Sequence, residues 1–414
     1  SAGHYPEGRS ENKGCEPEAI AYGKYRGKEM LFVGTERSSV VLVYELSRKR
    51  PGGANGNAIT PVYKQLLPAG FGPEGLLTIP RRNLLVVASE EDSREDGFRA
   101  QITLYTYGLG RATYPGIMSV EGDMGTPIPW AALSALAADK VDRNVAYTVS
   151  DSFFKSSRIL KIDLSSTPAL ITDEILLTLD GETVDLDPEG LATRADGGFW
   201  LASEGSETST NLLFKVTENG TIEDIVELPE SVNALQQRFG FEGVTSVGNG
   251  TDEVLLVCFQ REWLNDTEGF VRIGRYVVAD AEWTFFYYPL DEPTSPNGGW
   301  TGLSEIISLD DAGTMFAVVE RDNQAGPDAT IKKIYSFSIA DLMPKTEEQG
   351  DFEVITKTEV RDLLPDLKSD NGAVLEKVEG MMMQKNGDVW ICTDNDGVDD
   401  SNGETQFMNI GNIF

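Results

Sequence analysis

The feature that most constrains this chain is a short motif that recurs along its length. Its clearest copy runs from Asp187 to Glu204: a Pro-Glu-Gly corner, a short apolar run, an Asp-Gly-Gly turn, and a second apolar run that ends in an acid. Glycine supplies the positive φ that tight turns between strands require, so the motif predicts a β-hairpin. One carboxylate opens this hairpin and another closes it.

Six further copies make the motif a sevenfold repeat, with opening positions 53 to 74 residues apart. Most copies are followed by a third and a fourth apolar run, and four-stranded sheets repeated radially are typical of a β-propeller. We therefore predict an all-β fold, a seven-bladed β-propeller of four-stranded antiparallel blades, as a single domain over residues 1–414. The copies span Glu18–Glu36, Glu74–Glu90, Ser134–Asp151, Asp187–Glu204, Glu242–Gln260, Glu305–Glu320 and Glu379–Asp394.

The last repeat has a candidate third strand, Gln406–Ile410, but no clear outermost strand. Ring closure in propellers usually needs one terminus to supply a strand to the blade of the other. The N-terminal segment, residues 1–17, is polar and glycine-rich, and either it or Asn412–Phe414 is expected to complete the last blade, unless a preceding part of a longer protein does so.

Charge is the second strong signal. The chain has 35 Lys and Arg against 67 Asp and Glu, a formal net charge of −32. Nucleic acid and anionic lipid headgroups bind basic surfaces, so this composition argues against nucleic acid as a partner. No apolar run is long enough for membrane insertion. Two interpretations remain: affinity for divalent cations or a saline habitat, and a solvated acidic coat that keeps the protein soluble.

Several segments resemble known families. Residues 9–46 and 70–91 are similar to choice-of-anchor I domains, whereas residues 187–205, 318–339 and 379–397 resemble the phytase-like family, also called esterase-like activity of phytase. The resemblance implies a secreted or cell-surface propeller that depends on a metal and acts on phosphoesters, with a small phosphorylated molecule as its partner. Three glycosylation sequons, at Asn219, Asn249 and Asn265, agree with secretion.

The opening carboxylates are the candidate metal ligands. If each first strand lines the central channel, six carboxylates converge near one mouth, and they must either raise their pKa values or bind cations. Oxygen ligands in such number suit Ca²⁺, the predicted cofactor. The alternative is a structural ring in which the carboxylates accept backbone N–H groups of the neighbouring blade. The residues are Glu18, Glu74, Glu189, Glu242, Glu305 and Glu379.

Arginine directly follows the closing position in three repeats. Carboxylates that hold a metal, beside guanidinium groups that hold phosphate oxygens, are what a metal-assisted phosphoester site requires. The alternative is that each arginine neutralises the neighbouring acids. Adjacent residues of a strand point to opposite faces, so an arginine and the closing acid before it need not share a site. The candidate catalytic residues are Glu189, Glu320, Arg37, Arg261 and Arg321.

Asp394 and Asp396 begin an acidic, glycine-containing loop that includes Asp399 and Asp400 and reaches Glu404. Its oxygen density suits Ca²⁺, so Asp394 and Asp396 are further candidate ligands, although the EF-hand spacing is not met and a merely hydrated loop is the alternative. The only histidine is in the N-terminal segment, and no GxSxG elbow or P-loop occurs. A Ser-His-Asp triad and a histidine-ligated metal are therefore disfavoured.

Three hypotheses about function follow. The first is an extracellular, Ca²⁺-binding propeller that hydrolyses phosphoesters with the help of the metal. The second is a non-catalytic, calcium-stabilised module for binding or adhesion to a surface ligand. The third is a surface-structural subunit that self-associates. Propellers host all three classes of function, so the site must choose among them.

Overall fold

The computed structural model describes residues 2–47, 59–93, 99–110, 112–122, 125–206, 209–368, 373–398 and 401–414. These residues form 29 strands and two α-helices of four residues each, α1 (Glu230–Asn233) and α2 (Leu364–Leu367). The predicted all-β class is confirmed, and the fold is propeller-like. In the described part of the chain, no helix has the length and apolar character that a membrane crossing would need.

Each repeat begins with the antiparallel hairpin that its motif predicts. In the fourth repeat, β15 (Pro188–Thr193) pairs with β16 (Phe199–Ser203). Gly197 and Gly198, in the turn between them, have φ values of 96° and 78°. A Cβ on Gly198 would also lie 2.3 Å from the backbone oxygen of Val216. Conformation and space therefore both require glycine at the second turn position.

The seven repeats form seven successive sheets, in four of which four strands are joined in sequence order. The hairpin β13 (Thr178–Leu179) and β14 (Glu182–Thr183) links the third to the fourth sheet. Sheet one contains β1 (Pro17–Tyr25), β2 (Lys28–Thr35), β3 (Val40–Ser47) and β4 (Thr60–Pro68), and sheet two contains β5 (Pro73–Ile79), β6 (Leu84–Ser89) and β7 (Gln101–Thr106). Sheet three contains β9 (Leu133–Ala138), β10 (Val145–Ser150), β11 (Arg158–Asp163) and β12 (Ala169–Leu176), with β8 (Ile117–Ser119) parallel to β12.

The remaining sheets follow the same order. Sheet four adds β17 (Leu212–Val216) and β18 (Ile222–Glu227) to β15 and β16, and sheet five contains β19 (Phe241–Val247), β20 (Val254–Phe259), β21 (Phe270–Val277) and β22 (Glu282–Pro289). Sheet six contains β23 (Thr301–Ser308), β24 (Met315–Asp322), β25 (Lys332–Ser338) and β26 (Lys357–Asp362). Sheet seven contains β27 (Val378–Met383), β28 (Asp388–Thr393) and β29 (Phe407–Asn412).

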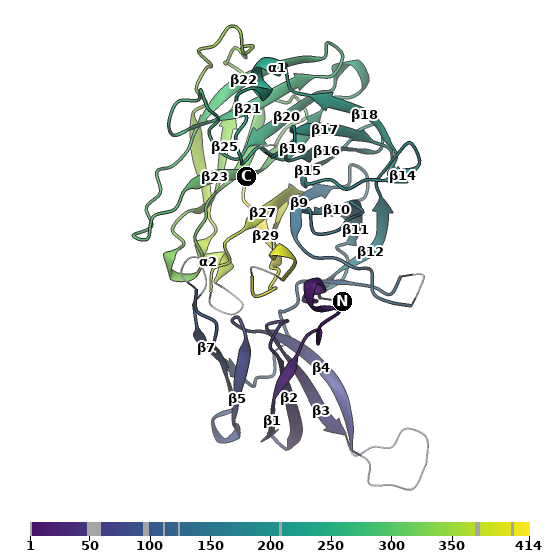
Figure 1. Ribbon diagram of the computed structural model, residues 1–414, viewed down its shortest axis with the longest axis vertical. Coiled ribbons are helices and arrows are strands. Elements are labelled where there is room, and N and C mark those ends of the chain that lie inside the picture. The colour runs from purple at the N-terminus through teal and green to yellow at the C-terminus, as the bar shows by residue number, and fades with distance from the viewer. Residues whose placement is uncertain are drawn as a thin grey trace.

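The expected count of seven blades in one ring is not confirmed. The first strands of five sheets contact one another in the cyclic order β9, β15, β19, β23, β27, and β27 packs back on β9 (Figure 1). Inside this ring, the backbone N–H of Leu136 donates to Oε2 of Glu305 at 3.3 Å. A Cβ on Gly380 would lie 2.8 Å from Cγ of Leu136, so this glycine lets β27 approach β9 and close the ring.

Sheets one and two stand outside the ring as a unit of their own, which we call the two-sheet unit (Figure 1). Their shared core contains Tyr25, Phe32, Val41, Leu85 and Val87. The N-terminal segment lies between this unit and the ring and supplies no strand to sheet seven, which has three strands in the described residues. Its predicted role in completing the last blade therefore has no counterpart among these strands.

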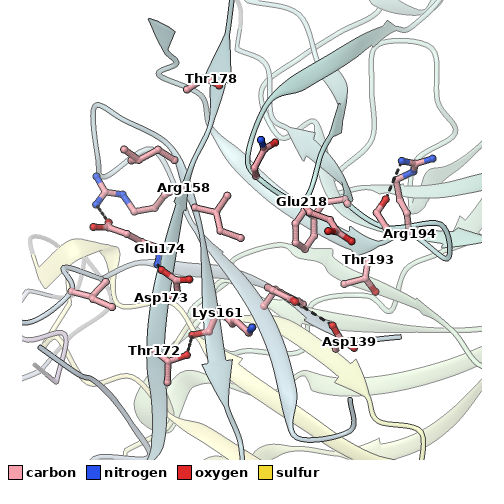
Figure 2. Close-up of a pocket in the computed structure, with 18 of the residues that line it drawn as sticks. Asp139, Arg158, Lys161, Thr172, Asp173, Glu174, Thr178, Thr193, Arg194 and Glu218 are labelled. Carbon is pink, nitrogen blue, oxygen red and sulfur yellow. Dashed lines mark hydrogen bonds and ion pairs between the residues drawn. The ribbon is translucent and has the colours of Figure 1, made fainter. Parts of the chain in front are cut away.

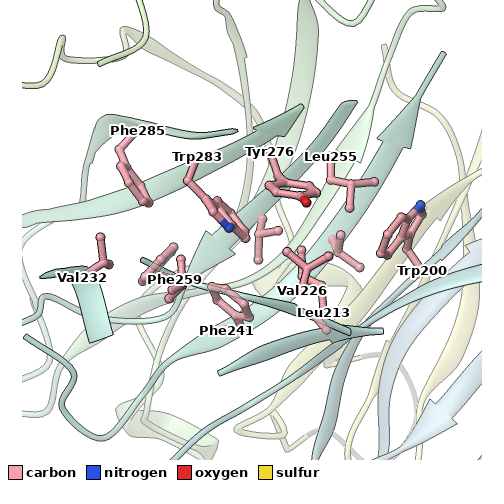
Figure 3. Close-up of a cluster of buried hydrophobic side chains, with 14 of the residues drawn as sticks. Trp200, Leu213, Val226, Val232, Phe241, Leu255, Phe259, Tyr276, Trp283 and Phe285 are labelled. Atoms are coloured by element: carbon pink, nitrogen blue, oxygen red, sulfur yellow. The ribbon is translucent and has the colours of Figure 1, made fainter. Parts of the chain in front are cut away.

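The largest aromatic core lies between sheets four and five (Figure 3). Phe241 packs edge-on against Phe259 at 5.2 Å between ring centroids, and Trp283 stacks against both Phe241 and Phe285. These side chains alternate along their strands with residues of the opposite face, as burial between two sheets requires. Such packing holds the first strands of the ring at fixed positions.

Candidate metal and anion site at one mouth of the ring

The carboxylates of the repeats gather where first strands begin and second strands end. Because the two strands are antiparallel, both positions lie at the same end of each sheet. In the five-sheet ring these ends form one mouth, which we call the acidic mouth. It contains Asp151, Asp187, Glu189, Glu204, Glu242, Glu376, Glu379 and Asp394, with Arg321 and Lys377 among them.

Three of these residues form a cluster suited to a cation. Asp151, Asp187 and Glu189 offer ligand oxygens that all lie within 4.8 Å of one another. Burial raises the pKa of Glu189 well above its usual range, and the charge of Asp151 adds to the increase. Burial and the hydrogen bond with Asp151 likewise raise the pKa of Asp187. Oδ1 of Asp187 is buried without a hydrogen-bond partner, so this all-oxygen set fits a hard divalent cation such as Ca²⁺.

Arg321, the last but one residue of β24, is the buried cation of the mouth. Its Nη2 lies 2.5 Å from Oε1 of Glu379, and its Nη1 lies 3.9 Å from Oε1 of Glu376. Nε and Nη1 are buried and have no hydrogen-bond partner in the described structure. Oε2 of Glu379 is unpartnered as well. The mouth therefore holds guanidinium donors and a carboxylate acceptor that are still free to bind.

Further charges surround this pair. Glu242 accepts a hydrogen bond from the side chain of Gln260, and its pKa is raised by burial and then by the charge of Glu379. Lys377 donates to Oδ2 of Asp394 at 3.2 Å and to Asp396. Burial raises the pKa of Glu204 to about 7 although the backbone N–H of Gly240 donates to it.

Arg261 stands at the rim, where Trp300 separates it from Arg321. The guanidinium carbon of Arg261 lies 4.9 Å from the centre of the indole ring, and that of Arg321 lies 5.6 Å from it. Arg261 also pairs with its neighbour Glu262 at 3.4 Å and is partly exposed. It can therefore meet an incoming anion, whereas Arg321 is reached only through the mouth.

Two predicted residues have structural partners instead. Glu305 lies inside the ring, where its oxygens accept the backbone N–H groups of Ile306 at 3.0 Å and Leu136 at 3.3 Å. This is the role that the structural alternative assigns to an opening carboxylate. Glu320 points away from Arg321 and contacts Lys357 at 2.6 Å and Tyr288 at 2.8 Å. Adjacent strand residues face opposite ways, so Glu320 and Arg321 do not share a site.

Glu18, Glu74 and Arg37 lie in the two-sheet unit and not in the acidic mouth. Glu18 clusters with Glu16 and Glu36, and Glu74 clusters with Glu36 and Glu90, each set with ligand oxygens within 4.8 Å. Arg37 pairs with Glu36 at 2.8 Å. Of the six opening carboxylates, the structure therefore brings Glu189, Glu242 and Glu379 together at the acidic mouth, because the two first sheets do not join the ring.

Asp394 belongs to the mouth, and Asp396 lies beside it: the backbone N–H of Asp396 donates to Oδ1 of Asp394 at 2.9 Å, and Lys377 donates to both carboxylates. Asp399 and Asp400 of the predicted calcium loop lie outside the described residues. The residues of the mouth that the sequence does not single out as site residues are Asp151, Asp187, Glu204, Glu376 and Lys377. Asp187 could have been found because it is the acid two positions before Glu189. The repeat gives no signal for Lys377, because a lysine directly precedes the first strand in one sheet only.

A family model described as Phytase-like, "Esterase-like activity of phytase", matches residues 128–397. The chain belongs to this phytase-like family. The match coincides with the five-sheet ring from β9 to β28 and so includes the whole acidic mouth. A second model, the choice-of-anchor I domain, matches residues 1–49, which carry the first strands of the two-sheet unit. Both resemblances noted in the sequence are thereby confirmed.

No curated protein matches this phytase-like chain. Among solved structures, hydrazine synthase of Kuenenia stuttgartiensis is 11% identical and covers 96% of each chain with a TM-score of 0.34. A calcium-binding protein, regucalcin, from Agrobacterium tumefaciens is 12% identical over 75% of this chain and 83% of that chain, with a TM-score of 0.29. Similarities this weak add nothing to the functional argument.

A cavity of about 1550 Å³ lies elsewhere, between sheets three and four (Figure 2). Two ion pairs lie among its lining residues, Arg158 with Glu174 at 2.6 Å and Arg194 with Asp196 at 2.9 Å, and the hydroxyl of Tyr147 donates to Asp139 at 3.2 Å. No residue of the acidic mouth lines it. Size alone therefore does not make this cavity the functional site of the phytase-like chain.

Proposed function

We propose that this phytase-like chain hydrolyses phosphoesters of small molecules at the acidic mouth, with Ca²⁺ as its cofactor, as a secreted or cell-surface protein. One observation carries the proposal. Arg321 is buried beside carboxylates and keeps two guanidinium nitrogens without a hydrogen-bond partner in the described structure, and Glu242 interacts electrostatically both with Arg321 and with Glu189 of the all-oxygen cluster. A phosphoryl group needs this combination, because guanidinium binds its oxygens and a divalent cation neutralises its charge.

Each residue has a distinct task in this proposal. Asp151, Asp187 and Glu189 would hold the cation, which when bound supplies Lewis-acid polarisation of a phosphoryl oxygen or water. Arg321 orients the phosphoryl oxygens, and Glu379 fixes the guanidinium plane. Glu204, with a pKa of about 7, can take or give a proton at neutral pH, which suits a general acid or base.

A second candidate is the non-catalytic, calcium-stabilised binding module. It is favoured by the burial of Arg321 and Glu242, each of which is only 3% exposed. A cation is small enough to enter such a buried mouth, whereas a phosphoester could enter only if the mouth opened. In this case calcium would stabilise the ring without turnover.

The cell-surface placement rests on different observations. The choice-of-anchor I match covers the start of the chain, and the net charge of −32 suits an environment rich in divalent cations. Localisation of a tagged full-length protein in its source cells, with and without surface proteolysis, would test it. Protection of the protein from added protease would contradict it.

The decisive experiment combines a phosphomonoester assay with thermal unfolding, in calcium and in EGTA. We expect turnover only with calcium, and loss of turnover in Asp187→Asn together with loss of calcium stabilisation. Arg321→Lys, which keeps the charge but not the bidentate fork, should reduce kcat about 100-fold or more. The control is Arg361→Lys, which alters an arginine–carboxylate pair with Asp366 far from the mouth.

The outcomes separate the two candidates. Calcium stabilisation without turnover would favour the binding module, because only a ligand that binds the folded state raises its stability. Turnover that survives EGTA would contradict metal dependence. If calcium changes neither stability nor turnover, the acids of the mouth are structural.

A further inference from the structure

The two-sheet unit presents a sheet face that no other sheet in the described part of the chain covers. On sheet two, Leu77, Val86 and Leu104 form one cross-strand row, with Ala88 and Ile102 in a neighbouring row on the same side. Leu77, Ile102 and Leu104 are 58%, 64% and 62% exposed. None of the five is charged, in a chain with a net charge of −32. We call this surface the β5–β7 face.

The corresponding faces of the ring sheets are all buried by a following sheet. The second strand of each ring sheet packs on the next first strand: β10 on β15, β16 on β19, β20 on β23, β24 on β27, and β28 on β9. Within the two-sheet unit, β2 packs on β5 in the same way. The second strand of sheet two, β6, makes no comparable contact in the described structure. The β5–β7 face is thus a blade surface that lacks its following blade.

The opposite side of the two-sheet unit carries the complementary surface. On sheet one, Ile20 and Tyr22 are 70% and 51% exposed. Ile20 lies opposite Val33, and Tyr22 lies opposite Leu31, on the neighbouring strand. Leu31 in turn lies opposite Tyr44 on β3, so all five side chains are on one side of the sheet. In the ring, a first strand in this position receives the preceding sheet. We call this surface the β1–β4 face, and it lacks its preceding blade.

We propose that the β5–β7 face of one copy of this chain packs on the β1–β4 face of a second copy. The contact would repeat the packing that already joins sheet one to sheet two within a chain. If the β5–β7 face of each copy packs on the β1–β4 face of the other, a twofold axis relates the two copies.

Two molecules with a charge of −32 repel each other, and faces with few charges are where they can meet at least cost. The β1–β4 face carries one cross-strand pair of opposite charges beside Tyr22, Lys24 with Glu29, which together add no net charge. The two-sheet unit projects away from the ring (Figure 1), which leaves Leu77 and Leu104 accessible, whereas Ile102 at the near edge also lines a cavity shared with Ala325 and Pro327.

Sedimentation velocity of the full chain, over a range of concentrations and at low and high salt, tests the proposal. We expect a dimer whose Kd falls as salt rises, because salt screens the repulsion between the copies. Leu104→Glu should raise this Kd about tenfold or more, since it buries a charge in an apolar contact. Leu264→Glu is the matched control, because Leu264 is 61% exposed but lies on the ring.

A mixing experiment tests which faces meet. Leu104→Glu and Tyr22→Glu should each weaken self-association, but a mixture of the two retains one intact pair of faces and should form a mixed dimer. Leu77→Gln replaces Leu104→Glu if that variant does not fold, as judged by circular dichroism. A wild type that is monomeric under all conditions would overturn the proposal. Dimers that are insensitive to both variants would also overturn it. A mixture that stays monomeric would overturn it as well, because it would mean that each face packs on the same face of the second copy.

Discussion

At the scale of single residues, the acidic mouth depends on Arg321. Its guanidinium lies within the mouth, and the acids Glu379, Glu376 and Glu242 all favour its charged form. A buried carboxylate that loses such a partner is left as an unpaired charge in a medium of low dielectric constant. The arrangement therefore makes Arg321 a stabilising residue as well as a candidate for phosphoryl binding.

The first prediction concerns the stability provided by this ion pair. We expect Arg321→Gln to lower the free energy of unfolding by about 3–5 kcal/mol, because Glu379 would remain buried without its partner. Urea unfolding monitored by circular dichroism measures the change. The double variant Arg321→Gln with Glu379→Gln should recover part of the loss, since it removes both charges. A single variant within about 0.5 kcal/mol of the wild type would show that water or ions already pair with Glu379.

The second prediction concerns pH. The pKa of Glu204 is raised by burial, and further by Asp151, from an ordinary value of 4.5 to about 7. A carboxyl with a raised pKa binds more protons in the folded than in the unfolded state. Its contribution to stability is therefore complete below pH 4.5 and is lost as pH rises through 7. Glu189 and Glu242 are shifted in the same direction.

We expect the free energy of unfolding, measured with EDTA, to fall as pH rises across this range. Glu204→Gln should make the fall shallower, because its amide does not titrate. Urea unfolding at a series of pH values provides the measurement, and Glu174→Gln, at the paired outer site with Arg158, is the control. Equal slopes in Glu204→Gln and the wild type would mean that Glu204 titrates normally.

Residue positions at the mouth could be predicted only in part. The repeat register correctly brings Glu189, Glu242, Glu379 and Arg321 to one end of their sheets, since the position within a hairpin is local information. Strand alternation also separates Glu320 from Arg321, as the sequence allowed. The partners of these residues could not be predicted, because Lys377 and Asp187 reach the mouth through turns that differ between repeats.

At the scale of elements, the hairpins follow from the sequence but their neighbours do not. Turn glycines and alternating apolar runs specify each hairpin locally, and the third strand predicted at Gln406–Ile410 is found as β29. Which first strand lies beside which is decided by packing between segments far apart in the chain. The sevenfold motif therefore predicts a sevenfold ring, whereas the contact of β27 with β9 closes the ring after five sheets.

The third prediction tests the close contact between first strands. Gly190 follows the opening Glu189, and a Cβ there would lie 2.5 Å from the backbone oxygen of Glu242 and 2.8 Å from the nitrogen of Val244. Backbone atoms of a neighbouring strand cannot move aside easily, so Gly190→Ala should destabilise the protein by about 1–3 kcal/mol. Gly110→Ala, where a Cβ meets nothing within 4 Å, is the control. Equal melting temperatures for the two variants would contradict tight packing of the ring.

At the scale of the whole molecule, the two family matches correspond to its two parts. The phytase-like match spans the ring, and the choice-of-anchor I match spans most of sheet one. Several contacts hold the parts together: Nδ1 of His4 donates to the backbone oxygen of Ser38 at 3.0 Å, and the side chain of Asn402 donates to the backbone oxygen of Ala69 at 2.9 Å. The parts should therefore unfold together, as one domain over residues 1–414.

Asn395 offers the sharpest test of that coupling. Its buried side chain accepts from the backbone N–H of Ala132 at 2.7 Å and donates to the backbone oxygens of Gly3 and Gly403, both at 3.0 Å. It thus joins sheet three, the N-terminal segment and the loop before β29. Asn395→Ala leaves three backbone groups without this partner, and each buried unpaired group costs about 1–3 kcal/mol.

We expect calorimetry to show one unfolding transition for the wild type and two for Asn395→Ala, because the two-sheet unit would separate from the ring before the ring unfolds. Asn395→Asp is the matched variant: it keeps the acceptor for Ala132 but loses both donors, so it isolates the link to the N-terminal segment. Two transitions in the wild type would show that residues 1–414 are not one cooperative domain. One unchanged transition in Asn395→Ala would show that Asn402 and His4 suffice to couple the two parts.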